Sequence, residues 1–262
     1  MLRVLTWTAA LVLLGIAGIR YSAPTPAEIE TERLNLPDTW VDHLYSRNPE
    51  DAKAASQWVA ENPDDALTVA LAVLRDPASG RERKKAALKA CGLIGSDASA
   101  AIPDAATLMT HTDLAAETAA ALSLMGPTAF TPLERALSSD DAVVRREALR
   151  GMGKLTGRAP LDPSTVVPLL IDGMGDPDGS VRAVAATYLG ILRSGAGNAV
   201  PALAAGLGDP FVEVRLASAT ALEAFGHEAR PALPALKKAA TDRDRDVARE
   251  AGRALVTIAA VR

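Results

Sequence analysis

The sequence predicts an all-α protein in which helical hairpins stack one on another, an architecture known as an α-solenoid. Hydrophobic residues make up 48% of the chain but aromatic residues only 3%, with alanine and leucine in their place. Large rings normally contribute much of the buried area of a single compact core. The alternating apolar pattern of strands is absent, and one helical pattern returns at a spacing near 33 residues. Together these features indicate closely packed, repeated layers of helices.

The chain begins with a hydrophobic segment. Residues 4–19 are apolar apart from two threonines, and Arg3 precedes them. Sixteen helical residues span about 24 Å, slightly less than the ~30 Å hydrocarbon core. We therefore predict that residues 1–20 are an N-terminal hydrophobic helix, either an uncleaved membrane anchor or a signal peptide cut after Ala17; a segment with neither role is a third alternative. The positive-inside rule places the rest of the chain outside the cytoplasm, periplasmic or extracellular. Cleavage of the signal would leave a secreted protein.

Two short regions separate this segment from the repeats. Residues 21–37 are rich in proline and polar residues and predict an extended linker. Residues 38–63 indicate a degenerate first repeat, with Trp40, Leu44 and Tyr45 on one helical face and Trp58 on the next helix. One interpretation is a hydrophobic cap on the stack, and the other is a docking surface.

The repeat is clearest where Val181, Val214 and Val247 align at a spacing of 33 residues. From each valine, apolar residues fall at positions 0, 4, 8 and 11, which is one face of a helix. Three earlier copies begin near residues 83, 114 and 144. A shorter apolar helix precedes each copy, and neither helix can cover its apolar stripe alone. Stacking therefore predicts one continuous core of six units over residues 64–262.

Prolines punctuate the units at two places. We expect prolines in the loops to begin the second helices, and another set to stand near the start of the first helices, because a missing N–H is tolerated there. The loop pairs are Asp76-Pro77, Asp176-Pro177 and Asp209-Pro210, and the other prolines are Pro103, Pro201 and Pro234.

The repeating pattern G-x-E-A-x-P-A-x-P-A-L, then D-P-x-x-x-V-R-x-x-A-x-x-A-L-x-x-x-G, resembles HEAT-like repeats of the phycobilin-lyase type. Residues 226–236 are the best copy of its first half and residues 209–226 of its second half. The resemblance covers about residues 64–262. It implies a right-handed, armadillo-type superhelix whose second helices line the concave side.

The resemblance also implies a structural role for the arginine that follows each repeat valine. In such families this arginine pairs with a loop acid of its own or the adjacent repeat. The expected ladder consists of Arg145, Arg182 and Arg215 with Asp140 (or Asp141), Asp176 and Asp209. Ala248 takes this position in the last unit. The alternative, a row of arginines that binds a polyanion, conflicts with 32 acidic residues against 28 basic ones, and nucleic-acid binding is not expected.

Residues two, six and nine positions after each valine face away from the apolar stripe. We predict either a solvated surface or a concave groove that binds another protein through an extended or helical segment of acidic character. The candidate groove residues are Lys85, Lys89, Arg146, Arg150, Thr187, Leu216, Thr220, Arg249 and Arg253.

No catalytic, cofactor-binding or metal-binding group of residues is recognised. Cys91 occupies a core position. His227-Glu228 is a single pair in a loop, whereas the HEAT-like deoxyhypusine hydroxylases hold iron with four such pairs on helices. The prediction is a non-enzymatic binding scaffold without a cofactor. The alternative is an enzyme or enzyme accessory similar to the phycobilin (tetrapyrrole) lyases.

Overall fold

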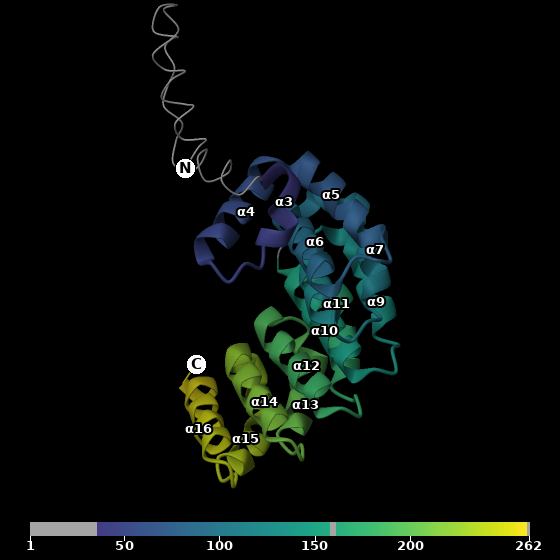
Figure 1. Ribbon diagram of the computed structural model, residues 1–262. Coiled ribbons are helices and arrows are strands. Elements are labelled where there is room, and N and C mark those ends of the chain that lie inside the picture. Colours follow the sequence, from purple (N-terminus) through teal and green to yellow (C-terminus); the bar gives the residue numbers. More distant parts are fainter. Residues whose placement is uncertain (1–35, 158–160, 261–262) are drawn as a thin grey trace, which may run out of the picture.

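The computed structural model describes residues 36–157 and 161–260, and all regular secondary structure in these two ranges is helical. The helices form a curved stack of hairpins (Figure 1). The predicted all-α solenoid is therefore confirmed. The predicted hydrophobic helix at residues 4–19 lies outside the described residues. Within the described ranges, no helix has the length and apolar character needed to cross a membrane.

Within the described residues, the helices form one short N-terminal pair and six hairpins. The N-terminal pair is α3 (Leu36–His43) and α4 (Pro49–Glu61). The hairpins are α5 (Pro63–Arg75) with α6 (Arg81–Ile94), α7 (Ile102–Leu108) with α8 (Ala115–Leu122), α9 (Phe130–Ala136) with α10 (Ala142–Thr156), α11 (Pro163–Gly173) with α12 (Gly179–Leu192), α13 (Ala196–Gly206) with α14 (Val212–Phe225), and α15 (Leu233–Ala239) with α16 (Arg245–Ala260). Three 3-10 helices connect units: η1 (Gly95–Ala101), η2 (Pro127–Ala129) and η3 (Gly226–Ala232).

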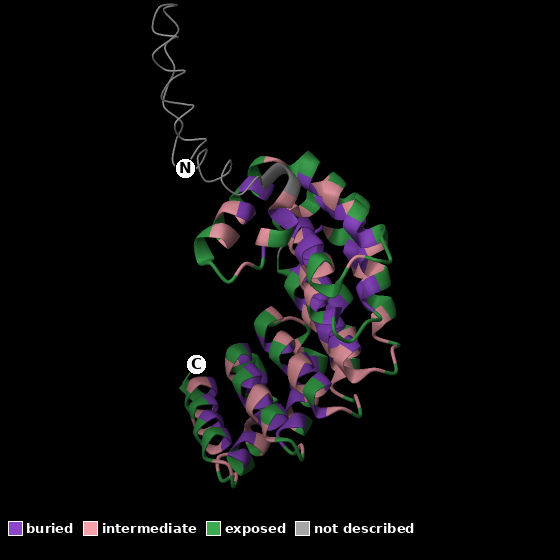
Figure 2. Ribbon diagram, in the orientation of Figure 1, coloured by how far each residue is buried: buried purple, intermediate pink, exposed green. Residues whose placement is uncertain are grey.

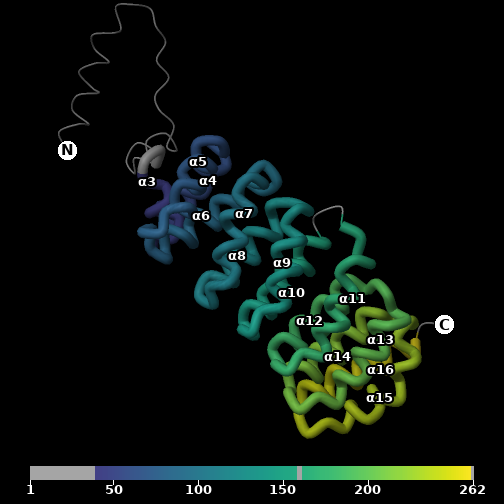
Figure 3. Tube along the Cα trace, turned by 90° about the vertical axis from the view of Figure 1, so that its right-hand side faces the viewer, coloured from purple at the N-terminus to yellow at the C-terminus, as the bar shows by residue number. Residues whose placement is uncertain are grey.

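The two helices of each hairpin lie in different layers. Figure 1 shows α6, α10, α12, α14 and α16 on the inner side of the arc, with α5, α7 and α9 on its outer side. Figure 3, turned by 90°, shows the hairpins following one another along the stack. Buried residues gather between the layers (Figure 2). The second helices therefore present one continuous concave surface.

The repeat valines and their apolar partners form the core, as the helical pattern predicts. Val181, Val214 and Val247 are all buried. Small residues let the second helices approach each other closely. A Cβ added to Gly190 would lie 2.7 Å from the Cα of Ala221 on the next second helix. Each unit thus covers its apolar stripe with its neighbours, which is the source of stability in stacked repeats.

The loop prolines do not begin the second helices, so that expectation was wrong. Pro177 precedes the first residue of α12 by two positions, and Pro210 stands in the same place before α14. The preceding aspartate explains the difference. Asp176 Oδ1 accepts the backbone N–H of Asp178 at 2.9 Å, and Asp209 Oδ1 accepts that of Phe211 at 2.9 Å. This turn places proline at a position that needs no donor.

The prolines of the first helices divide into two groups. Pro103 and Pro234 lie in the first turn of α7 and α15, as expected. Pro201 instead lies inside α13, which begins five residues earlier at Ala196. The backbone N–H groups of Asn198 and Ala199 both donate to the carbonyl of Gly195 at 3.0 Å, so the helix already begins upstream and the proline lies beyond its first turn.

The N-terminal pair covers the end of the stack with its tryptophans. Trp40 and Trp58 are buried, and their rings stack with centroids 6.3 Å apart. Neither indole is therefore free to form a docking surface. Tyr45 does not share their burial: it follows the end of α3 and is 47% exposed.

Candidate functional site

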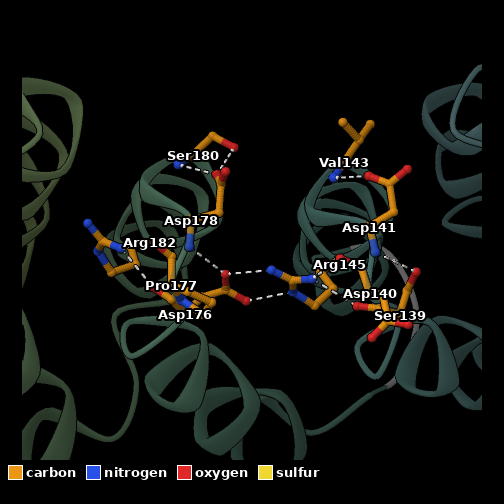
Figure 4. Close-up of polar contacts among 10 residues, drawn as sticks. All are labelled: Ser139, Asp140, Asp141, Val143, Arg145, Asp176, Pro177, Asp178, Ser180 and Arg182. Atoms are coloured by element: carbon orange, nitrogen blue, oxygen red, sulfur yellow. Dashed lines mark hydrogen bonds and ion pairs between the residues drawn. The ribbon is translucent and has the colours of Figure 1, made fainter.

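An arginine joins each of three successive units to the next on the edge of the solenoid. Arg145 Nε and Nη2 donate to the two carboxylate oxygens of Asp176 at 2.7 and 2.8 Å. Its Nη1 donates to the backbone carbonyls of Ser139 and Asp140 at 2.8 and 3.0 Å (Figure 4). One guanidinium therefore binds the loop of its own unit through carbonyls and the loop of the next unit through a carboxylate.

The same arrangement occurs twice more. Arg182 binds the carboxylate of Asp209 through two hydrogen bonds of 2.7 and 2.9 Å. Arg215 binds Asp242 through two of 2.8 and 2.9 Å. Asp242 was missed by the sequence reasoning, although it follows Asp209 by the same 33 residues that separate Asp209 from Asp176. The 33-residue spacing could have identified Asp242, which lacks the Asp-Pro signature because Arg243 follows it.

Asp140 does not take the predicted place in this ladder. It contributes its backbone carbonyl to Arg145, and not its carboxylate. Asp141, the alternative, caps α10 by accepting the N–H of Val143 at 2.8 Å and accepts a hydrogen bond from Thr112. The ladder begins at Arg145, because the preceding unit has Ala115 at the repeat position of the arginine.

The ladder pairs are charged at neutral pH. The hydrogen bonds from Arg145 lower the pKa of Asp176, and those from Arg215 lower the pKa of Asp242. Burial by itself raises the pKa of Asp209, but the hydrogen bonds from Arg182 and the backbone outweigh it and the pKa falls. Because both sides of each guanidinium are occupied within the protein, these arginines are structural and present no free row to a polyanion.

The concave surface is less basic than its residue types indicate. On α6, Lys85 Nζ lies 3.3 Å from Glu117 Oε1 on α8. Lys89 Nζ donates to the carbonyl of Leu44 at 3.0 Å and lies 4.8 Å from the ring centroid of Tyr45. These two lysines therefore join α6 to its neighbours.

Two candidate groove residues on α10 share one buried carboxylate. Arg146 Nε lies 2.9 Å from Glu147 Oε1, and Arg150 Nη1 lies 2.9 Å from Glu147 Oε2. Glu147 is only 2% exposed, and burial of an unpaired carboxylate is costly. Two arginines face one acid, so this part of the surface keeps an excess of positive charge. Sequence reasoning missed Glu147, although glutamate recurs three positions after the repeat start, as in Glu250.

The C-terminal part of the concave surface contains a second inter-unit network. Arg253 Nη2 lies 2.7 Å from Glu223 Oε2 on α14 and 2.7 Å from Glu250 Oε1 on α16. Thr220 Oγ1 is 3.3 Å from Glu250 Oε1. Arg249 pairs with an exposed acid of its own helix, Asp246. Every basic candidate groove residue thus contacts an acid or a carbonyl, which helix positions alone did not predict.

The remaining candidates line a groove between α12 and α14. Its volume is about 520 Å³, and Thr187, Leu216 and Thr220 contribute to its wall. The rest of the wall is mainly small and aliphatic. Ile191 also lines the groove and is 58% exposed, which is unusual for a large aliphatic side chain in the described part of the chain. Glu213 lies at the end formed by the start of α14.

Cys91, His227 and Glu228 are the nucleophilic or metal-ligating side chains that the sequence analysis singled out. Cys91 is fully buried on α6, and burial raises the pKa of its thiol to about 12. His227 and Glu228 are exposed in η3. Across residues 36–157 and 161–260, no three His, Cys, Asp or Glu side chains are grouped so as to hold a metal ion.

The stacked helical hairpins define an α-solenoid (Figure 1). Residues 167–256 match the family model of HEAT repeats, which covers part of α11 and the units that follow it. The resemblance to HEAT-like repeats predicted from the sequence is therefore confirmed. No curated protein matches the chain in sequence.

Solved structures extend the likeness of fold to most of the chain. Kap95p, in a structure with RanGDP, is 14% identical with a TM-score of 0.61; the match covers 88% of this chain and 37% of Kap95p. Escherichia coli YibA is 16% identical with a TM-score of 0.53, over 90% and 98% of the two chains. The CpcE–CpcF complex of phycocyanin lyase from Nostoc sp. gives 23% identity and a TM-score of 0.50, over 59% and 98%. These likenesses concern the fold alone.

Proposed function

We propose that this protein is a non-catalytic scaffold that binds another protein along the concave surface of α6 to α16. The observation that carries the proposal is the groove between α12 and α14, with an exposed Ile191 on its wall. Exposed aliphatic surface inside a concavity is typical of binding sites. A structural neighbour, Kap95p, is a solenoid that binds RanGDP, which is consistent with this use of the fold.

The distribution of positive charge indicates which part of the concave surface would attract an acidic segment of the partner. Arg146 and Arg150 share the single carboxylate of Glu147, and Lys89 contacts a carbonyl and a ring but no acid. An acidic segment of the partner, extended or helical, would therefore lie over α6 and α10.

Reversal of Arg146 and Arg150 to glutamate is not a clean test, because it would surround buried Glu147 with like charges. Site-specific photocrosslinking avoids this problem. A photoreactive residue replaces Thr187, which is exposed on α12 and lines the groove, or Thr68, which is exposed on α5 and does not line it. Both hydroxyls only donate to their own helix, at 2.8 and 2.9 Å.

In native membranes, the full chain with the probe at residue 187 should crosslink to one discrete protein, and the chain with the probe at residue 68 should not. Equal crosslinking at both positions, or none at residue 187, would reject the concave surface as the binding site.

We further propose that residues 4–19 tether the protein to a membrane, with the solenoid periplasmic or extracellular. The apolar composition and Arg3 support this placement. Mass spectrometry of the mature N-terminus tests it: an intact residue 1 in the membrane fraction supports the anchor, and a terminus at residue 18 supports a cleaved signal with secretion. Protection of the solenoid from added protease in spheroplasts, which lack the outer membrane, would place it in the cytoplasm and reject both.

The alternative of a lyase-like enzyme or accessory is supported by the repeat type and by the fold of CpcE and CpcF. It predicts that the purified protein takes up a linear tetrapyrrole with a shift in visible absorbance. An unchanged tetrapyrrole spectrum would favour the scaffold.

A further inference from the structure

The wall of the groove between α12 and α14 leaves the backbone of a bound segment without partners. Thr187 and Thr220 carry the hydroxyls of this wall, and each donates its proton to a carbonyl four residues back in its own helix, at 2.8 and 3.0 Å. The ionised carboxylate of Glu213 is an acceptor only. No lining side chain therefore offers a free donor to a peptide carbonyl.

This property selects the conformation of the occupant. An extended segment would find no donor for the carbonyls that it turns toward this wall, and a buried polar group without a partner weakens binding. A helix satisfies its own backbone hydrogen bonds. The groove therefore fits a helix that contributes only side chains to the contact.

The dimensions of the groove agree with one apolar stripe of a helix. On α12 the lining runs from Ala183 to Ile191, eight steps along the helix or about 12 Å. Anchors at i, i+4 and i+7 of a bound helix span about 10.5 Å, the usual arrangement when a helix lies in a groove. The small side chains of Ala183, Ala217 and Ala224 leave space for the bound helix. Ile191 and Leu216 provide apolar contacts.

Glu213 indicates the charge that accompanies this stripe. Its side chain is exposed and has no hydrogen bond or ion pair with any other described residue. By contrast, Glu117 on α8, Glu147 on α10 and Glu223 at the other end of α14 all contact basic side chains. An unpaired carboxylate at one end of an apolar groove favours a cation on the occupant.

We propose that the groove between α12 and α14 binds an amphipathic helix of the partner protein, through an aliphatic stripe at i, i+4 and i+7 and a lysine or arginine that pairs with Glu213. This inference rests on the proposed scaffold function and specifies the chemistry of the partner at one end of the concave surface.

Labelled 18-residue peptides test the proposal, with the full-length protein in lipid nanodiscs and binding followed by fluorescence anisotropy. The first peptide carries three leucines at i, i+4 and i+7 and one arginine a turn beyond them. The second has the same composition with the leucines at alternating positions, and the third has glutamate in place of arginine. The first should bind at least tenfold more tightly than the second.

Two protein variants separate the contribution of shape from that of charge. Thr187→Arg fills the groove and should weaken the first and third peptides at least tenfold, while the matched control Thr68→Arg on α5 leaves both unchanged. Glu213→Arg should weaken the arginine peptide about twofold to fivefold and strengthen the glutamate peptide by a similar factor, as for an exposed ion pair. Circular dichroism melts confirm that each variant is folded.

Equal affinity for the first two peptides, or no loss with Thr187→Arg, would overturn the inference. The two proposals can fail separately. Crosslinking of a native partner at residue 187 without a preference for the striped peptide would leave the scaffold function in place and reject the helical occupant. If the protein preferred the striped peptide but crosslinked equally at residues 187 and 68, the preference of the groove for a helix would stand. The concave surface would then be rejected as the site that binds the native partner.

Discussion

Replacement of Gly190 by alanine should destabilise the solenoid, although alanine is normally the better helix former. Gly190 lies in α12 and faces Ala221 of α14. An added Cβ would lie 2.7 Å from the Cα and 2.8 Å from the Cβ of Ala221. Carbon atoms in good contact are about 3.5–4.0 Å apart. The two helices would therefore have to separate by about 1 Å, because the obstacle is backbone and cannot rotate away.

The magnitude follows from two opposing effects. Overpacking of a well-packed core costs about 1–3 kcal/mol. Replacement of glycine by alanine inside a helix contributes about 0.5–1 kcal/mol in the opposite direction. We expect Gly190→Ala to lower the free energy of unfolding by about 1–2 kcal/mol.

Gly252 provides a matched control in the same kind of element. It lies in α16, and nothing comes within 4 Å of a Cβ added there. Gly252→Ala should raise stability by about 0.5–1 kcal/mol. Urea unfolding followed by circular dichroism measures both variants. If Gly190→Ala were as stabilising as Gly252→Ala, the close approach of α12 to α14 would be refuted.

Three further predictions concern the ladder and the buried thiol. Arg182→Met should lower the free energy of unfolding by about 2–4 kcal/mol, because it leaves the carboxylate of Asp209 unpaired and that side chain is only 11% exposed. A double-mutant cycle with Asp209→Asn tests the pair. Additive effects of the two substitutions on the free energy of unfolding would contradict a direct interaction. The lowered pKa values of Asp176, Asp209 and Asp242 contribute stability that is complete above the unfolded-state pKa of about 3.9 and is lost as pH falls through the folded-state values. Urea midpoints should therefore fall steeply below about pH 4, and a flat profile there would show that the ladder does not contribute. Cys91 should not react with a thiol reagent at pH 8 until the protein unfolds, because its thiol is buried and its pKa is about 12; rapid reaction of the folded protein would place it at the surface.

Much of the architecture was accessible from spacing. The recurrence of Val181, Val214 and Val247 predicted both the helices and their stacking, because a helix with one apolar stripe needs a neighbour to cover it. The same period contains Asp242, which lacks the Asp-Pro signature because Arg243 follows it where proline follows Asp209.

Helix starts were harder to place than helices. The pair Asp176-Pro177 was expected to open a helix, but the carboxylate forms a turn with the N–H of Asp178 and also binds Arg145 of the preceding unit. Asp176 therefore both forms this turn and pairs with Arg145, and the pairing depends on a residue 31 positions away. Local preference could not indicate that contact.

The amino-acid sequence by itself determined the class of fold and the apolar stripe of each second helix, because both depend on helical periodicity within each segment. Only the tertiary structure decided how the surface residues pair. Arg253 contacts Glu223, and Lys85 contacts Glu117, across helices whose separation and rotation are set by packing of the whole stack. For the same reason, the groove between α12 and α14 and the unpaired carboxylate of Glu213 are properties of two helices together and of neither sequence segment alone.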